Sequence, residues 1–132
     1  MEPADYPDDP SIADDAILWR RIPPYHVIYD HNMGRERPTS DAFVDSPDTP
    51  MSVALATRCK DADEFLQGHA GFAVVSFTAG IARKLGQRVA ADQRPDQPVW
   101  HAFVIGKKTD SVRKKFAKNF TWVVAPPPRI PP

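Results

Sequence analysis

The residues best suited to bind an anion lie in one basic segment, 106–120, with the sequence GKKTDSVRKKFAKNF. Lys107 and Lys108 directly precede a predicted helix, and Thr109 is placed to cap its first turn. Cations at a helix start oppose the helix dipole, whereas the backbone amides there attract anions. We therefore expect Lys107, Lys108, Thr109 and Arg113 to bind a phosphate-bearing ligand.

The same segment also has a purely structural interpretation. On a helix beginning at Asp110, Val112, Phe116 and Phe120 form an apolar stripe, and the cations cover the opposite face. In that case the cations only keep an amphipathic helix hydrated.

The segment is not a P-loop, although it contains Gly-Lys-Lys-Thr at 106–109. A P-loop needs a glycine five residues before its Gly-Lys pair, so that backbone amides surround the phosphate. His101 occupies that position, and residues 101–105 have the composition of a strand.

Further anion donors lie in a long polar segment with the sequence RERPTSDAF, where Arg35, Arg37 and Ser40 fall close together. Guanidinium and hydroxyl groups are good donors to phosphate and carboxylate oxygens. We expect a loop here, and long loops in small domains often carry function. A hydrated surface loop without a ligand is the alternative.

Among the four histidines, His101 is the candidate catalytic residue. It lies on a predicted strand that leads to Lys107, so it can act as a general acid or base at the edge of a basic site. The alternative is a core histidine with a hydrogen-bonded ring. No metal site is expected, because His26 and His31 are five apart and Cys59 is the single cysteine.

An arginine near the start and a serine on a strand resemble the pattern of toxin-like ADP-ribosyltransferases. Arg20 or Arg21 and Ser40 or Ser52 match those two positions. That family also implies a catalytic glutamate late in the chain. The glutamates here are residues 2, 36 and 64, so the chain departs from the pattern at this position.

The sequence predicts an α+β fold, a single domain with a small mixed sheet and three to four short helices packed on it. Strands are expected at 25–30, 72–75, 99–105 and 121–124. Helices are expected at 11–22, after Asp61, after Ser76 and after Thr109 or Asp110, and residues 17–22 and 52–57 also read as strands. Residues 89–98 are expected to form a loop.

The domain is expected to span residues 11–124, between an acidic tail at 1–10, disordered or draped, and a polyproline tail at 125–132. A single cysteine, an acidic N-terminus and the lack of a long apolar run indicate a soluble cytoplasmic protein with no membrane contact. Nothing in the sequence indicates a cofactor.

The zero net charge hides an asymmetry between the two halves of the chain. Residues 1–50 carry four Lys/Arg and eleven Asp/Glu, a net of −7, and residues 51–132 carry thirteen and six, a net of +7. Two interpretations fit this asymmetry: the halves attract one another across the fold, or the basic half faces an anionic partner.

Three functions follow from these patterns. The first is a module that binds a phosphate-bearing anionic ligand, most simply nucleic acid or a nucleotide, through the basic half. The second is a protein-interaction adaptor that uses its charge polarity and proline-rich tail. The third is a metal-independent ribonuclease or other small effector enzyme in which His101 acts with Lys107, Lys108 and Arg113.

Overall fold

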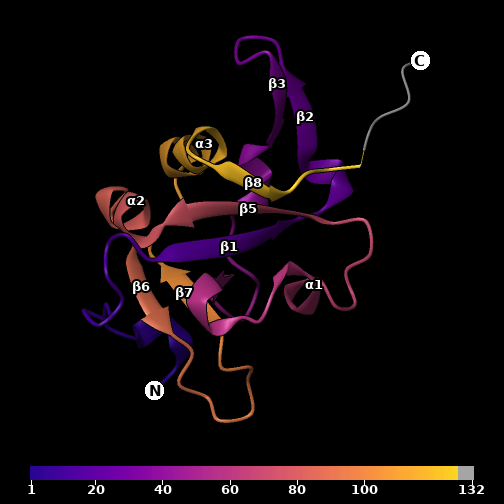
Figure 1. Cartoon of the computed structure of the whole chain (residues 1–132). Coiled ribbons are helices and arrows are strands. Elements are labelled where there is room, and N and C mark those ends of the chain that lie inside the picture. The colour runs from indigo at the N-terminus through magenta and orange to yellow at the C-terminus, as the bar shows by residue number, and fades with distance from the viewer. Residues whose placement is uncertain (128–132) are drawn as a thin grey trace.

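Six strands form the central sheet of the computed structural model, which describes residues 1–127 (Figure 1). Their order is β6-β7-β4-β1-β5-β8, and every neighbouring pair is antiparallel. Their bounds are β1 Ile17–Ile22, β4 Met51–Leu55, β5 Ala73–Thr78, β6 Arg88–Ala91, β7 His101–Ile105 and β8 Thr121–Val124. A separate hairpin pairs β2 Val27–Asp30 with β3 Arg35–Pro38.

The helices are short: α1 Ala62–Phe65, α2 Ala79–Lys84 and α3 Asp110–Lys118. The α+β class predicted from the sequence is therefore confirmed, with three α-helices in the described residues. The sheet, however, is antiparallel rather than mixed.

The predicted helix over 11–22 is wrong, because residues 11–16 are turns and irregular backbone and residues 17–22 form β1 within the sheet. Leu18 and Ile22 are fully buried on one side of the strand, which is the two-residue period of a strand rather than a helix. Ser11 does not cap a helix. Its backbone amide and hydroxyl both bond to Asp9. Pairing with β4 and β5 therefore overrides the local helix signals.

Two other strands were expected to be loops. β3 lies in the polar RERP segment and pairs with β2, and β6 pairs with β7 at one edge of the sheet. Both are only four residues long and contain arginine, so neither has a strong hydrophobic period. Their strand conformation comes from a partner strand supplied by the fold.

Helix starts were predicted more closely. Asp61 caps α1 and Thr109 caps α3 through side-chain bonds to Glu64 N and Val112 N, as expected. The cap of α2 is Thr78 rather than Ser76, because β5 extends through Phe77.

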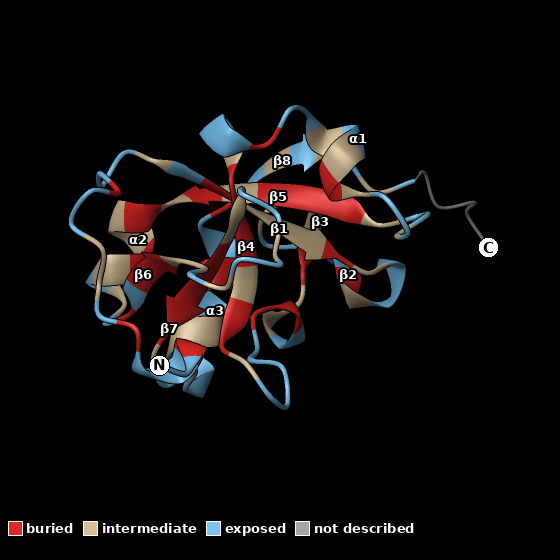
Figure 2. Cartoon of the chain, turned by 90° about the horizontal axis from the view of Figure 1, so that it is seen from below, coloured by how far each residue is buried: buried red, intermediate tan, exposed pale blue. Residues whose placement is uncertain are grey.

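One face of the sheet, the core face, carries the main hydrophobic core. The hairpin, α2 and α3 pack on this side (Figures 1 and 2). Phe43 stacks on Phe116 of α3 with ring centroids 5.5 Å apart, and Phe77 of β5 lies 4.9 Å from Phe116. This aromatic cluster joins α3 to the sheet.

The opposite face, the second face, is covered only in part. Tyr6 packs on Phe103 at the β6–β7 side, and Phe65 of α1 packs against Ala54 and Val74 further along. Between these two coverings lie partly exposed polar side chains on β1, β4 and β7: Arg21, Ser52 and His101.

The first ten residues run along the β6 edge. Asp9 N donates to Val89 O, and the Asp8 carboxylate accepts from Val89 N and from Arg83. Arg88 donates to the carbonyl oxygens of Ala4 and Tyr6. This segment covers an otherwise unpaired sheet edge.

Within residues 1–127, no helix combines the length and apolar character needed to cross a membrane. The predicted polyproline tail falls mainly on residues 128–132, outside the described residues.

Candidate functional site

His101 is held by two hydrogen bonds on the second face. Its Nδ1 lies 2.7 Å from Oδ2 of Asp92, and its Nε2 lies 3.1 Å from Oγ of Ser52. β4 and β7 bring Ser52 and His101 together, because their register pairs Ala54 with His101 and places Ser52 diagonally beside it on the same face. Asp92 directly follows β6, the strand on the other side of β7.

Asp92 is a rigid and ionised partner for the imidazole. Its side chain is 0% exposed, and Arg94 donates to both of its carboxylate oxygens at 2.8–3.2 Å. Burial alone would raise the pKa of Asp92, but hydrogen bonds from Arg94 and His101 outweigh that effect and bring the pKa to about 2. Asp92 is therefore a carboxylate at neutral pH.

An ionised Asp92 determines the tautomer of His101. A carboxylate only accepts hydrogen bonds, so Nδ1 of His101 must carry the proton. Burial lowers the pKa of His101, although Asp92 opposes this, and the ring is neutral at pH 7. Nε2 then has a free lone pair, and the Ser52 hydroxyl donates to it.

Two arginines of β1 place positive charge around Ser52. Arg20 is buried on the core face, where it donates to the carbonyl oxygens of Ala42, Val44 and Ser52, and burial lowers its pKa to about 10. Arg21 points to the second face, where its charge helps to lower the pKa of His101. The last β1–β4 pair is Trp19 with Ala54, and the two-residue period of the strands places Arg21 and Ser52 beyond this pair on the same face of the sheet.

Arg21 has no acidic partner within residues 1–127. Its guanidinium carbon lies 4.6 Å from the ring centroid of Phe65, and its Nη1 donates to Phe65 O at 2.9 Å. Burial lowers its pKa. A half-buried cation without a counter-ion is unfavourable, and an anionic ligand would relieve that cost.

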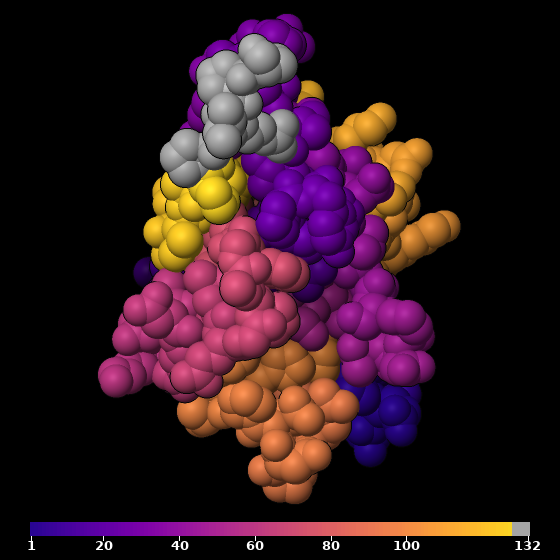
Figure 3. Space-filling model, turned by 90° about the vertical axis from the view of Figure 1, so that its right-hand side faces the viewer, coloured from indigo at the N-terminus to yellow at the C-terminus, as the bar shows by residue number. Residues whose placement is uncertain are grey.

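Aromatic side chains border the site on the α1 side. Trp100 lies 5.3 Å from Phe65 between ring centroids, and its indole Nε1 donates to Glu64 of α1. Trp19 lies 6.2 Å from Phe65, and both tryptophans are partly exposed. Figure 3 shows the α1 segment and the β6–β7 connection meeting on one side of the molecule.

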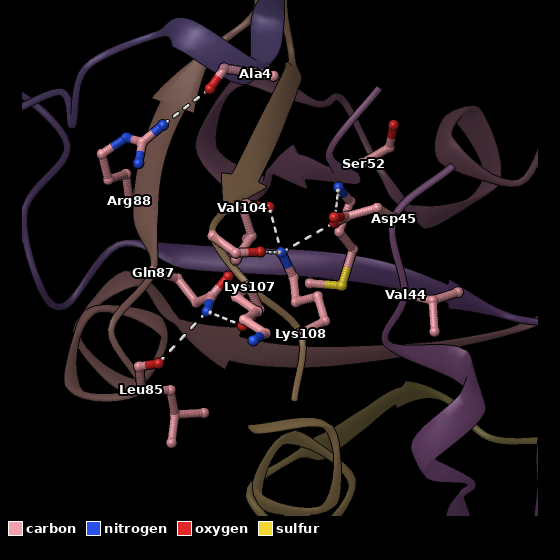
Figure 4. A network of polar contacts seen from close by, with 12 residues as sticks. Ala4, Val44, Asp45, Ser52, Leu85, Gln87, Arg88, Val104, Lys107 and Lys108 are labelled. Carbon is pink, nitrogen blue, oxygen red and sulfur yellow. Dashed lines mark hydrogen bonds and ion pairs between the residues drawn. The ribbon is translucent and has the colours of Figure 1, made fainter. Parts of the chain in front are cut away.

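Lys108, a predicted ligand-binding residue, is an internal structural group. Its side chain is 5% exposed, and Nζ contacts Val104 O at 3.0 Å, Gly106 O at 2.9 Å and Asp45 Oδ1 at 3.0 Å (Figure 4). These partners use all three N–H groups of the ammonium. No donor of Lys108 is left for a ligand in this structure.

The remaining residues of the basic segment are not brought together around His101. Lys107 is exposed, Thr109 caps α3, and Arg113 pairs with Asp110 and Asp41. β7 separates His101 from Lys107 by six residues, or roughly 20 Å in extended chain. These cations therefore do not complete a site with His101.

The hairpin residues meet α3 instead. Arg37 and Ser40 join Lys114 and Lys118 around a hollow of about 310 Å³ on the α3 side. Arg37 is bound to Asp30 at 2.6 Å, which neutralises part of its charge. Arg35 stacks over Phe120, with its guanidinium carbon 4.7 Å from the ring centroid.

A larger hollow, about 430 Å³, lies beside Gly106 and is lined by Ala4, Arg88 and residues 45–50. It contains Asp45 and Asp48 together with Arg88, whose guanidinium already donates hydrogen bonds to carbonyl oxygens of the N-terminal segment. The mixed charge does not favour an anion there. Residues 1–127 contain no group of three His, Cys, Asp or Glu side chains arranged to hold a metal ion.

No family model matches the chain, and no curated protein or solved structure is significantly similar to it. The site is therefore assigned from its own geometry. Of its members, His101 was predicted directly, and Arg21 and Ser52 stood among the residues that resemble ADP-ribosyltransferases. Asp92 was missed, because it lies in a segment expected to be a loop. The one sequence feature that could have indicated it is the Asp-x-Arg spacing of Asp92 and Arg94 before the strand that carries His101.

Proposed function

We propose that the protein binds a phosphate-bearing small molecule of the nucleotide class on the second face, at Arg21, Ser52 and His101. The observation that carries this proposal is the half-buried guanidinium of Arg21, which lacks an acidic partner in residues 1–127 and lies on the face of the sheet that carries the hydrogen bond between Ser52 and His101. Its planar donor fork suits phosphate oxygens.

The charge balance at this position supports an anionic ligand. Asp92 is already neutralised by Arg94, so it does not cancel the charge of Arg21. Arg20 adds a second cation on the other side of the sheet, also without a carboxylate within ion-pair distance in the described residues. Two arginines of β1 therefore bring positive charge to this part of the sheet, although the chain is neutral overall.

The rings beside Arg21 favour a ligand with a heteroaromatic base. Trp19 and Trp100 are partly exposed at the margin of the site, and planar bases stack on such rings with about 1–3 kcal/mol per base. A phosphate on Arg21 and a base over a tryptophan together describe a nucleotide.

A second candidate is nucleic acid on the α3 side, supported by the hollow between Arg37, Ser40, Lys114 and Lys118. Lys114 and Lys118 are exposed cations that could neutralise backbone phosphates, and such binding would weaken steeply with salt. Of these residues, Arg37 and Ser40 are among those that the sequence predicted to bind a ligand.

One titration separates the two sites. Mono- and dinucleotides and a short oligonucleotide are titrated into the full chain, with the imidazole resonances of His101 observed by NMR. We expect a nucleotide to shift the His101 resonances, Arg21→Met to weaken binding at least tenfold, and the Lys114→Ala/Lys118→Ala pair to leave it unchanged.

The opposite pattern assigns binding to α3. If the lysine pair abolishes binding, the salt slope is steep and Arg21→Met has no effect, the second-face proposal is wrong. Arg21→Met keeps an unbranched stem over Phe65, so the variant removes the charge with little loss of packing.

A further inference from the structure

We infer that Ser52 is the nucleophile of a phosphoryl-transfer site, with His101 as its general base and Asp92 as the residue that positions the base. This inference rests on the proposed function, because it takes the phosphate-bearing ligand at Arg21 as the substrate. It adds covalent chemistry at Oγ of Ser52, which ligand binding does not require.

The order of hydrogen bonds carries the inference. Asp92 accepts from Nδ1–H of His101, and Nε2 of His101 accepts from the hydroxyl of Ser52, at 2.7 and 3.1 Å. A serine is a weak nucleophile by itself, and this arrangement of a base held by a third group is what activates it. If the two ring nitrogens exchanged partners, Ser52 would no longer be activated. The order of the hydrogen bonds therefore supports a role of Ser52 as a nucleophile.

A histidine that served only to fill the core would not need these partners in this order. Asp92 is immobilised by the fork of Arg94, which also lies over Phe103 at 5.6 Å from the ring centroid. The imidazole of His101 is therefore held by the Asp92 carboxylate, and the carboxylate is held by the guanidinium of Arg94. Such support fixes both the tautomer and the orientation of a base. Ser52, at the other end of this series of hydrogen bonds, is partly exposed.

The groups around Ser52 favour phosphorus rather than an acyl carbon as the electrophile. Acyl transfer needs donors, usually backbone amides, aimed at one developing oxyanion. Ser52 is a residue of the strand β4 and does not lie at a helix N-terminus, where backbone amides are free to bind an anion. The cationic side chain that β1 places on this face is Arg21, whose guanidinium keeps further N–H groups for phosphoryl oxygens besides the one bonded to Phe65 O.

The proposed reaction is balanced without a metal or a redox partner. Ser52 Oγ bonds to phosphorus and the bond from phosphorus to the leaving alcohol breaks, while the hydroxyl proton passes to Nε2 of His101 and then to the leaving oxygen. Water next attacks the phosphoserine, with His101 taking its proton and returning it to Oγ. The net result is a phosphodiester and water converted into a phosphomonoester and an alcohol.

A fluorophosphonate probe tests the nucleophile without knowledge of the natural substrate. Ser52 Oγ would displace fluoride, its proton leaving with the fluoride through His101, and the adduct is located by intact mass and peptide mapping. We expect a single adduct at Ser52, none in Ser52→Ala, and a rate about 10²–10⁴-fold lower in His101→Gln. Ser76 is a matched control: it is a partly buried serine on the same face, paired with Trp19, and Ser76→Ala should label like wild type.

Asp92→Asn tests the positioning role separately. The amide can donate to Nδ1, which would move the proton to Nε2 and remove the acceptor for Ser52. We expect the ¹⁵N shifts of His101 to report this change of tautomer, together with lost labelling and an unchanged circular dichroism spectrum. Unchanged ¹⁵N shifts with full labelling would refute the role.

Three results would overturn the inference. Wild-type protein that stays unlabelled while nucleotide binding still depends on Arg21 would show a binding site with a structural histidine. Labelling that survives His101→Gln would remove the general base. Release of p-nitrophenol from p-nitrophenyl acetate but not from bis(p-nitrophenyl) phosphate would assign the serine to acyl rather than phosphoryl transfer. Loss of nucleotide binding with labelling intact would instead refute the proposed ligand class at Arg21.

Discussion

Replacing Lys108 with methionine should destabilise the fold, whereas the same change at its neighbour Lys107 should not. Methionine keeps most of the apolar stem of Lys108 and removes the ammonium group. The carbonyl oxygens of Val104 and Gly106 then lose a donor at 3.0 and 2.9 Å, and Asp45 loses its ion pair.

The size of the effect follows from how buried each partner is. Val104 is 0% exposed, and a buried acceptor left without a donor costs about 1–3 kcal/mol. Gly106 is only partly buried and the Asp45 side chain is 45% exposed, so water replaces much of what they lose, and together they add about 1 kcal/mol. We therefore expect a loss of about 2–4 kcal/mol in the free energy of unfolding.

Urea unfolding followed by tryptophan fluorescence measures this difference. With a slope of about 1–3 kcal/mol per molar urea, Lys108→Met should lower the midpoint by roughly 1–2 M. Lys107 is exposed and contributes only its backbone carbonyl, which accepts from Gln87, so Lys107→Met should stay within about 0.5 kcal/mol of wild type. Equal midpoints for the two variants would refute the assignment of Lys108 as a structural group. If Lys108→Met does not fold, Asp45→Asn should still show a smaller loss in the same direction.

Other predictions concern the cap, the core, the N-terminal segment and acid stability. Thr109→Ala should lose about 1 kcal/mol in urea, because Oγ1 accepts from Val112 N at 3.2 Å, and Thr109→Ser should recover most of it. Phe43→Ala removes a ring stacked on α3 and should lose about 3–5 kcal/mol; a loss below 1 kcal/mol contradicts the packing. Arg83→Ala frees Asp8 and Asp14, and amide hydrogen exchange should rise in residues 1–12 but not in β7. The folded-state pKa of Asp92, about 2, lies below its usual value of 3.8, so its contribution is complete above pH 3.8 and is lost as the pH falls towards 2. Asp92→Asn should flatten that part of the stability profile, and an unchanged profile would contradict the low pKa.

Sequence-based prediction succeeded where a few neighbouring residues decide the conformation. Thr109 and Asp61 cap helices through bonds that span three residues, and Gly86 takes a φ of 79° just after α2. The strand that begins at His101 was also predicted, because its apolar run favours β structure whatever its neighbours are.

The prediction failed where residues distant in the sequence determine the conformation or the burial of a segment. Residues 17–22 carry helix-end signals but form a central strand, since β4 and β5 supply hydrogen bonds and a buried surface on both sides. Lys107 and Lys108 look alike in the sequence, yet one is exposed and the other is buried on the carbonyls of a strand end.

The candidate site shows the same contrast between local and long-range determinants. The types of its residues were visible, and His101 was singled out by its place on a strand. Its partners were not: Ser52 lies 49 residues away and Asp92 follows a strand that had no periodic signal. Hydrogen-bond partners across a sheet depend on strand order and register, which are set by long-range pairing and burial rather than by local composition. The sequence thus determined which chemical groups are present and where helices begin. The tertiary structure decided that Asp92 and Ser52 hydrogen-bond to His101, and that Lys108 donates to the carbonyl oxygens of Val104 and Gly106.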